Sequence, residues 1–145
     1  MAPNPASAVR HVCGQNNTHL EIKVTGFAHA QDSRLLGHLF ATTAMKTVFS
    51  DTSTLNCWLE IEAVLARIQS DLGLIPEDAA IAIENACVPD RYDLEQLGAG
   101  IAAASHPLTP IIAAIEANSG DYGQYVHFGA TTQDILDTGL VLQMR

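Results

Sequence analysis

The sequence predicts an all-α fold. In the longest patterned stretch, residues 50–74, apolar side chains recur at steps of three and four, which is the period of an amphipathic helix. Proline and glycine residues lie between the patterned stretches, where helices commonly begin and end. After residue 30, no stretch alternates apolar and polar side chains as a half-buried strand does. We therefore expect about five or six helices with short connections and no internal repeat.

The N-terminal part differs from this helical body. Residues 1–18 are rich in Pro, Asn and Ser and predict a flexible tail, whereas residues 19–145 form the predicted helical domain. At the start of that domain, residues 19–30 alternate around Ile22 and Val24, so they form either a short strand or an extended arm.

The next two helices are predicted by their caps. Residues 42–50, which follow a short apolar piece, predict a helix of about two turns that begins at Thr42 or Thr43. The strongest helix covers residues 50–74, with Ser50 or Asp51 as its N-cap. Its apolar side chains fall on one stripe that we expect to face the core: Trp58, Ile61, Leu65, Ile68 and Leu72. Of these, Trp58, Leu65 and Ile68 are predicted to be core residues.

Glycine and proline residues mark the later boundaries. Gly73 suits the position after a last helical turn, and Pro76 suits the first turn of a helix over residues 76–86. A further helix over about 90–104 ends before Pro107, which begins the next helix. After a turn at 117–123, the last helix begins near Thr132, and its apolar side chains include Ile135, Leu136, Leu140 and Val141.

Composition narrows the classes of function. The 145 residues are 48% hydrophobic, which suits one folded domain or part of one. The net charge is −9, with 7 Lys+Arg against 16 Asp+Glu, and this argues against nucleic acid and anionic membranes as partners. A local cluster of donors can still bind an anionic substrate. No stretch approaches the roughly 20 apolar residues of a membrane span, and no signal peptide is recognisable, so we expect a cytoplasmic protein.

Cysteine and histidine residues give little reason to expect a metal. The three cysteines are far apart and include no CxxC pair, which favours a reducing compartment over a disulfide framework. His11, Cys13 and His19 lie close together in sequence, but their surroundings are polar and without predicted structure. We therefore predict neither a metal nor a cofactor.

The stretch HFGATTQD, residues 127–134, carries the clearest functional pattern. Gly129 allows a turn, and Thr131 or Thr132 can cap the helix that follows. The free N–H groups at a helix start and the positive end of its dipole favour a carboxylate or phosphate. Threonine hydroxyls and the amide of Gln133 add further donors. The pattern therefore favours an anion site at the start of this helix.

Two histidines strengthen the pattern. His127 lies just before the turn, and His106 lies at the start of the preceding helix, so two consecutive helices each begin near an imidazole. Asp134 suits the helix dipole and can orient a neighbouring histidine. From the residues alone another interpretation stays open, namely a capped helix with a satisfied histidine and a surface histidine at a helix start.

Four stretches together resemble one known family. YVHFGATTQDILDTGLVLQMR is similar to the first signature region of the fumarase/aspartase superfamily. FSDTSTLNCWLEIEAVLARIQSDLGLIPEDAA resembles the second helix of that family's N-terminal domain, SHPLTPIIAAIEA the helix before the signature, and DSRLLGHLF the opening segment. The likeness is collinear over about residues 32–145. The GATTQD form resembles the 3-carboxy-cis,cis-muconate cycloisomerase branch more than the adenylosuccinate lyases.

The resemblance implies a lyase or cycloisomerase that acts on a small polycarboxylate. It implies a full-length homotetramer whose active sites form from three subunits. Carried over by position, the implied catalytic residues are His106 and His127. The implied substrate-binding residues are Arg34, Thr131, Thr132, Gln133 and Asp134. Within the superfamily, an adenylosuccinate lyase and a trans-aconitate decarboxylase-type enzyme remain alternatives.

Parts of the family pattern do not occur in these 145 residues. The serine loop, of the form GSS-x-MP-x-K-x-NP, and the GRTH-like histidine region are both absent, as are the long helices of the central bundle. We therefore expect a domain truncated within its last helix and inactive by itself. A non-catalytic helical fragment that binds an anion or a partner subunit is the alternative from a different class.

Overall fold

The computed structural model describes residues 29–145, and within them it is all-α, as predicted. Its α-helices are α1 (Thr43–Val48), α2 (Asp51–Asp71), α3 (Glu77–Ala86), α4 (Leu94–Ala104), α5 (Thr109–Asn118) and α6 (Thr132–Met144). Short 3-10 turns are η2 (Ala30–Asp32), η3 (Gly37–Leu39), η4 (Pro89–Arg91) and η5 (Gly120–Tyr125). The predicted tail and most of the predicted strand or arm lie outside the described residues.

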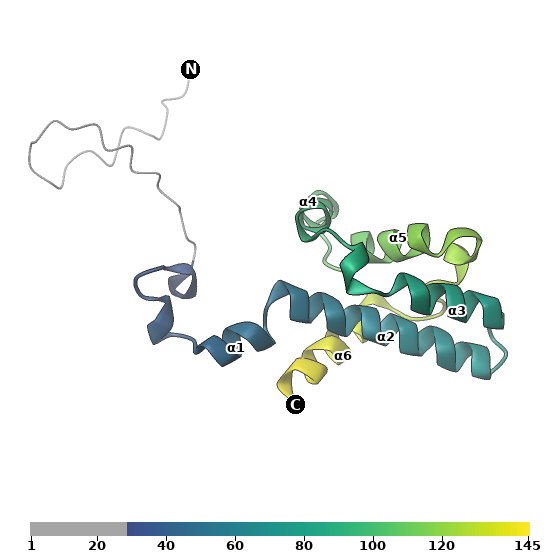
Figure 1. The fold of residues 1–145 in the computed structure, drawn as a ribbon, viewed down its shortest axis with the longest axis horizontal. Coiled ribbons are helices and arrows are strands. Elements are labelled where there is room, and N and C mark those ends of the chain that lie inside the picture. The colour runs from purple at the N-terminus through teal and green to yellow at the C-terminus, as the bar shows by residue number, and fades with distance from the viewer. Residues whose placement is uncertain (1–28) are drawn as a thin grey trace, which may run out of the picture.

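Helix α2 is the central element of the bundle (Figure 1). It packs against α3 along one side and against α6 along another. Helix α5 contacts α3 and α4, and η5 leads from α5 back along α3 toward the start of α6. The largest fully buried apolar side chains are Leu59, Ile83, Leu108, Ile111 and Ile115. The core therefore lies between α2, α3 and α5.

The predicted caps of α2 are confirmed. Ser50 Oγ accepts a hydrogen bond from the N–H of Ser53, at 3.2 Å. At the other end, Gly73 adopts a left-handed φ of 70°, which glycine adopts without strain. The N–H of Gly73 donates to Ser70 O at 2.9 Å and the N–H of Leu74 to Gln69 O at 2.8 Å. These two bonds are those of a Schellman motif, which satisfies the last carbonyl groups of the helix.

The predicted core face of α2 is confirmed only in part. The side chains that are buried on this helix are Leu55, Leu59, Glu62, Ala66 and Gln69. Ile68, a predicted core residue, is 49% exposed, and Leu72 is 69% exposed. Trp58 and Leu65 are half-buried beside the core. The buried face carries two polar residues, so the apolar pattern points to the neighbouring stripe instead.

Three of the predicted boundaries also shift. Helix α4 begins at Leu94 rather than near residue 90, because Pro89–Arg91 forms a 3-10 turn. Asp93 caps α4 by accepting hydrogen bonds from the N–H groups of Glu95 and Gln96, at 2.8 and 3.2 Å. Helix α5 begins at Thr109 rather than Pro107. It continues to Asn118, and η5 then replaces most of the predicted turn at 117–123.

The end of α6 is joined to the beginning of the bundle. Gln143 Nε2 donates to Val48 O at 2.9 Å and contacts Thr54 Oγ1 at 3.0 Å. Val48 ends α1 and Thr54 lies in the first turn of α2. This contact and the packing of α6 along α2 fix the direction of α6, and thereby the place of its N-terminus.

Candidate active site

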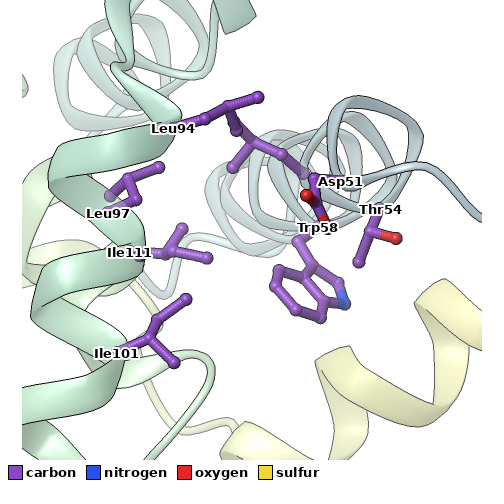
Figure 2. A pocket seen from close by; sticks show the side chains of 9 residues that line it. Asp51, Thr54, Trp58, Leu94, Leu97, Ile101 and Ile111 are labelled. Atoms are coloured by element: carbon purple, nitrogen blue, oxygen red, sulfur yellow. The ribbon is translucent and has the colours of Figure 1, made fainter. Parts of the chain in front are cut away.

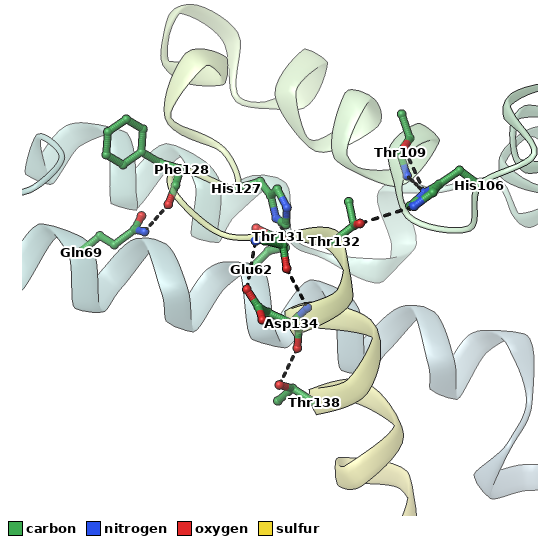
Figure 3. A network of polar contacts seen from close by, with 10 residues as sticks. All are labelled: Glu62, Gln69, His106, Thr109, His127, Phe128, Thr131, Thr132, Asp134 and Thr138. Carbon is green, nitrogen blue, oxygen red and sulfur yellow. Dashed lines mark hydrogen bonds and ion pairs between the residues drawn. The ribbon is translucent and has the colours of Figure 1, made fainter.

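The start of α6 is built by a reciprocal cap (Figure 3). Thr131 is the N-cap, and its Oγ1 accepts from the N–H of Asp134 at 3.4 Å. In return, the N–H of Thr131 donates to Asp134 Oδ2 at 3.0 Å. Hydrogen bonds from Thr131 hold the pKa of Asp134 below its usual range, with the backbone hydrogen bond as the largest cause. Gly129, with a φ of 69°, makes the turn that brings the chain into this cap.

His106 caps the start of α5 and reaches toward α6. Its Nδ1 accepts from the N–H groups of Leu108 and Thr109, each at 3.2 Å. Its Nε2 lies 3.4 Å from Thr132 Oγ1, the first residue of α6. The structure therefore brings the N-terminal ends of α5 and α6 together, with one imidazole between them (Figure 3).

His127 is held by a residue that the sequence pattern did not indicate. Its Nδ1 lies 2.7 Å from Glu62 Oε1, in the middle of α2. The side chain of Glu62 is 1% exposed and that of His127 is 13% exposed. Burial raises the pKa of Glu62, although hydrogen bonding and charge interaction with His127 oppose the shift. A second buried polar residue, Gln69, donates from Nε2 to Phe128 O at 2.6 Å and holds the next residue of the same segment.

The pair of Glu62 and His127 is not fully satisfied by hydrogen bonds. Glu62 Oε2 and His127 Nε2 are both buried atoms without a hydrogen-bond partner among the described residues. His127 also has a left-handed φ of 56°, which is uncommon for a residue other than glycine. Residues with a strained backbone conformation cluster at active sites and ligand-binding segments.

The expectation that Asp134 orients a histidine is corrected by this geometry. The carboxylate that contacts His127 belongs to Glu62, and Asp134 is occupied by the cap of α6. Gln133 is exposed, and its Nε2 donates to Asp137 Oδ1 at 2.7 Å. The hydroxyl of Thr131 accepts as a helix cap, so Thr132 has the hydroxyl that lies next to an imidazole. The substrate-binding roles of these residues stay predictions.

Among the described residues, no contact links Arg34 to the candidate site at the starts of α5 and α6. Arg34 is exposed and lies between η2 and η3. Within the described residues, the part of the chain from 29 to 42 lies beyond α1, away from the bundle (Figure 1). The substrate-facing role that the family resemblance implies for Arg34 therefore also stays a prediction.

A separate hollow of about 210 Å³ lies between α2, α4 and α5 (Figure 2). Most of its lining is apolar, with Trp58, Leu97, Ile101 and Ile111 among the lining side chains. Asp51 and Thr54 also line it, and neither histidine of the candidate site does. This hollow is therefore a gap in apolar packing rather than part of the candidate site.

Neither a metal cluster nor a membrane-spanning helix occurs in the described part of the chain. Between residues 29 and 145, no cluster of three or more His, Cys, Asp or Glu side chains is arranged to hold a metal ion. His11, Cys13 and His19 lie outside the described residues. None of the helices in the same range is both long and apolar enough to cross a membrane.

Known proteins resemble this chain over most of its length. No protein-family model matches it. It is 39% identical over 118 residues to an N-acetyl-S-(2-succino)cysteine lyase of Enterococcus italicus, covering 81% of this chain and 26% of the relative. It is 40% identical over 126 residues to trans-aconitate decarboxylase 1 of Mycosarcoma maydis, covering 86% and 26%.

A solved structure supports the same relationship. The 3-carboxy-cis,cis-muconate lactonizing enzyme from Pseudomonas putida superposes with a TM-score of 0.71 at 42% identity. The match covers 78% of this chain and 27% of that enzyme. The chain therefore spans about a quarter of the length of the relatives that it matches.

Proposed function

We propose that this chain, which belongs to the fumarase/aspartase superfamily, supplies part of the active site of a lyase or cycloisomerase that acts on a small polycarboxylate. The observation that carries the proposal is the meeting of two helix N-termini at one imidazole. His106 caps α5 and lies 3.4 Å from Thr132 at the start of α6. His127 lies a few residues before α6, and its ring is held by a buried contact with Glu62 on α2.

This arrangement suits a carboxylate physically. The free N–H groups of a helix start and the positive end of its dipole stabilise a negative charge. The hydroxyl of Thr132 adds a donor, and so does Nε2 of His106, because Nδ1 of that ring accepts from the N–H groups of Leu108 and Thr109. Such fixed donors stabilise charge that develops on a carboxylate during elimination or addition. The site is on an acidic chain, but its local donors favour an anion.

The proposed reaction is closest to that of a 3-carboxy-cis,cis-muconate cycloisomerase. The match to the Pseudomonas putida enzyme supports this choice. A trans-aconitate decarboxylase-type enzyme and an adenylosuccinate lyase stay alternatives within the superfamily. The match to an N-acetyl-S-(2-succino)cysteine lyase adds a candidate that the sequence motifs alone did not suggest. The names of all three relatives refer to a polycarboxylic acid, which supports the substrate class more than any one substrate.

We also propose a homotetrameric, cytoplasmic enzyme for the full-length form. Exposed apolar side chains on α2 and α6 support a further interface: Val64, Ile68, Leu140 and Val141. Exposed apolar side chains that gather on a surface are commonly covered by other parts of an assembly. The odd number of cysteines without a CxxC pair supports a reducing compartment.

An activity screen of the full-length gene product tests the proposal. It would follow 3-carboxymuconate, trans-aconitate, adenylosuccinate and N-acetyl-S-(2-succino)cysteine in parallel, with the 145-residue chain as control. We expect turnover of one acid by the long form and none by the short chain. Absence of turnover by both, with retained binding of a polycarboxylate, would instead support the non-catalytic fragment.

Two variants of the full-length enzyme test the site. Thr132→Ala removes a donor, so we expect a higher KM, and His127→Asn removes the ring, so we expect kcat to fall by roughly 100-fold or more. Thr138→Ala is the matched control, because Thr138 is an exposed α6 threonine whose hydroxyl donates to Asp134 O. Unchanged kinetics in both test variants would remove the motif from the active site.

A further inference from the structure

The two imidazoles of the candidate site are held through the same ring nitrogen in opposite ways. Nδ1 of His106 receives two backbone N–H groups, from Leu108 and Thr109, so this nitrogen must be unprotonated. A neutral His106 therefore carries its hydrogen on Nε2, which faces Thr132 Oγ1. Nδ1 of His127 instead faces a carboxyl oxygen of Glu62 at 2.7 Å. An ionised carboxylate only accepts, so neutral His127 carries its hydrogen on Nδ1 and leaves Nε2 bare.

We propose that Glu62 is a positioning residue that holds His127 in the tautomer opposite to that of His106, so that the site presents one ring N–H and one ring lone pair. The inference rests on the proposed function in one respect, namely that both histidines belong to the active site. It adds a residue on α2 to a site otherwise built from α5 and α6.

Burial argues that Glu62 has more than a packing role. A carboxyl group at 1% exposure costs free energy unless it is paired, and an apolar side chain of similar volume is often as stable. Only one oxygen of Glu62 has a partner, and His127 Nε2 has none among the described residues. A pair selected only for stability would leave fewer buried atoms unsatisfied. The unpaired Nε2 is the atom of the pair that is free to meet a ligand.

The protonation state of Glu62 and His127 determines how Nε2 of His127 would bind such a ligand. With Glu62 ionised and His127 neutral, Nε2 is a hydrogen-bond acceptor. One added proton can bind to Nε2 directly. Alternatively, Glu62 becomes protonated and its O–H donates to Nδ1. The single hydrogen of the neutral ring then lies on Nε2. In both cases the single proton turns Nε2 from an acceptor into a donor. A carboxylate ligand needs the donor form, so it binds together with one proton, whereas an acidic group of a ligand can transfer its proton to the bare form.

Two other titratable groups lie near enough to affect the pair. Cys87 interacts with Glu62, and burial, as the largest cause, raises the pKa of its thiol to about 12. It therefore stays neutral in mildly alkaline solution. Asp134 interacts with His127, and its lowered pKa keeps it ionised in the same range. Neither group changes its charge where neutral histidine is observed, so the tautomers can be compared there.

The experiment is ¹⁵N NMR of the 145-residue chain labelled at histidine, in mildly alkaline solution without ligand. Two-bond ¹H–¹⁵N correlations distinguish Nδ1–H from Nε2–H rings, and His106→Asn and His127→Asn assign the two signals. We expect an Nδ1–H ring at His127 and an Nε2–H ring at His106. An Nε2–H ring at His127 would overturn the proposal.

Two substitutions of Glu62 then test its role. Glu62→Gln keeps an oxygen that accepts from Nδ1, so we expect the His127 tautomer to be retained. Glu62→Met fills a similar volume without an acceptor, so we expect His127 to change to the Nε2–H form. The His106 signal is the internal control and should not change in either variant. An unchanged His127 tautomer in a folded Glu62→Met chain would overturn the proposal, and if that variant does not fold, the wild-type tautomer still decides.

Turnover of the full-length enzyme is measured separately. A fall in kcat for Glu62→Met would support both the tautomer and its use in catalysis. If the NMR results are as expected but kcat and KM do not change, the tautomer stands and the placement of His127 in the active site fails. The two kinds of failure are therefore distinguishable.

Discussion

Gly139 on α6 faces the indole ring of Trp58 on α2 so closely that a Cβ atom at position 139 would lie 2.7 Å from Cδ1 and 2.8 Å from Nε1 of the ring. No real Cβ atom approaches an aromatic ring so closely. The glycine is therefore required by the contact between the two helices, since its backbone has no unusual φ. Because α6 carries the candidate site at its other end, this contact also helps to place the site.

We expect Gly139→Ala to lower the free energy of unfolding by about 1–3 kcal/mol, because the added methyl group forces Trp58 or α6 to move. Urea denaturation followed by circular dichroism measures the change. Gly98→Ala is the matched control, since Gly98 is exposed within α4 and nothing lies within 4 Å of the position that an added methyl group would take. Higher helix propensity should make that variant more stable by about 0.5–1 kcal/mol. Equal effects of the two substitutions would contradict the close contact.

The buried face of α2 can be tested with two large apolar residues. Leu59 is 1% exposed, whereas Ile68 is 49% exposed. We expect Leu59→Ala to cost about 2–5 kcal/mol of stability because it leaves a cavity in the core. Ile68→Ala should cost less than about 1 kcal/mol in the isolated chain. The comparison uses urea midpoints and slopes. A larger loss of stability for Ile68→Ala than for Leu59→Ala would support the buried face that the apolar pattern predicts.

The cap at the start of α6 should contribute measurably to stability. Thr131→Ala removes the hydroxyl that accepts from the N–H of Asp134, so we expect a loss of about 1 kcal/mol. Thr138→Ala removes an exposed hydroxyl that donates to Asp134 O within the same helix, and it should be close to neutral. Thermal unfolding of both variants against the wild type gives the comparison. A cap without function in stability would show the same melting temperature for all three.

The same cap predicts a pH dependence. Hydrogen bonds from Thr131 hold the pKa of Asp134 below its usual 3.8, so the folded state binds this proton less tightly than the unfolded state. The stabilisation is therefore complete above pH 3.8 and is lost as the pH falls through the lower folded value. We expect wild type to exceed Asp134→Asn in melting temperature at neutral pH, and the difference to narrow under strong acid. A difference that is constant with pH would argue against this assignment.

Cys87 should react slowly with alkylating reagents while the chain is folded. Burial raises the pKa of its thiol from 9.0 to about 12, so the thiolate fraction near pH 8 falls by on the order of a thousandfold. Alkylation with iodoacetamide in buffer and in concentrated urea, followed by mass spectrometry of the peptide, compares the two states. Similar rates in both would mean that the thiol is not shielded in the fold.

The helices and their caps could be predicted because they depend on neighbouring residues. Ser50 and Gly73 bound α2 through hydrogen bonds within one turn, and the sequence pattern identifies both positions. The start of α4 could not be placed, because whether Pro89 opens a helix or a 3-10 turn depends on the competing cap at Asp93. The sequence therefore predicts that a helix forms more reliably than it predicts the residue at which the helix begins.

The candidate site was predicted only in part, for a related reason. HFGATTQD identifies the helix start and His127, because its residues are adjacent in sequence. The partner of His127 lies 65 residues earlier, and Glu62 resembles any charged residue on an amphipathic helix. One signal was present: Glu62 follows Leu59 by three residues and precedes Ala66 by four, so a carboxylate shares a face with small and apolar side chains. The burial of Glu62 depends on α3 and on the segment before α6, which pack over it from elsewhere in the sequence.

The buried polar atoms of α2 have a consequence for the order in which the chain folds. Helices α2 and α3 are neighbours in sequence and can pair early, whereas the partners of Glu62 and Gln69, namely His127 and Phe128 O, come 65 and 59 residues later. Until that segment docks, both polar groups must remain hydrated. If the segment docks one residue out of register, each group is buried unpaired, at a cost of about 1–3 kcal/mol. A wholly apolar face on α2 would pack against the last helix in several alignments. The two polar side chains instead favour the single alignment in which both are hydrogen-bonded.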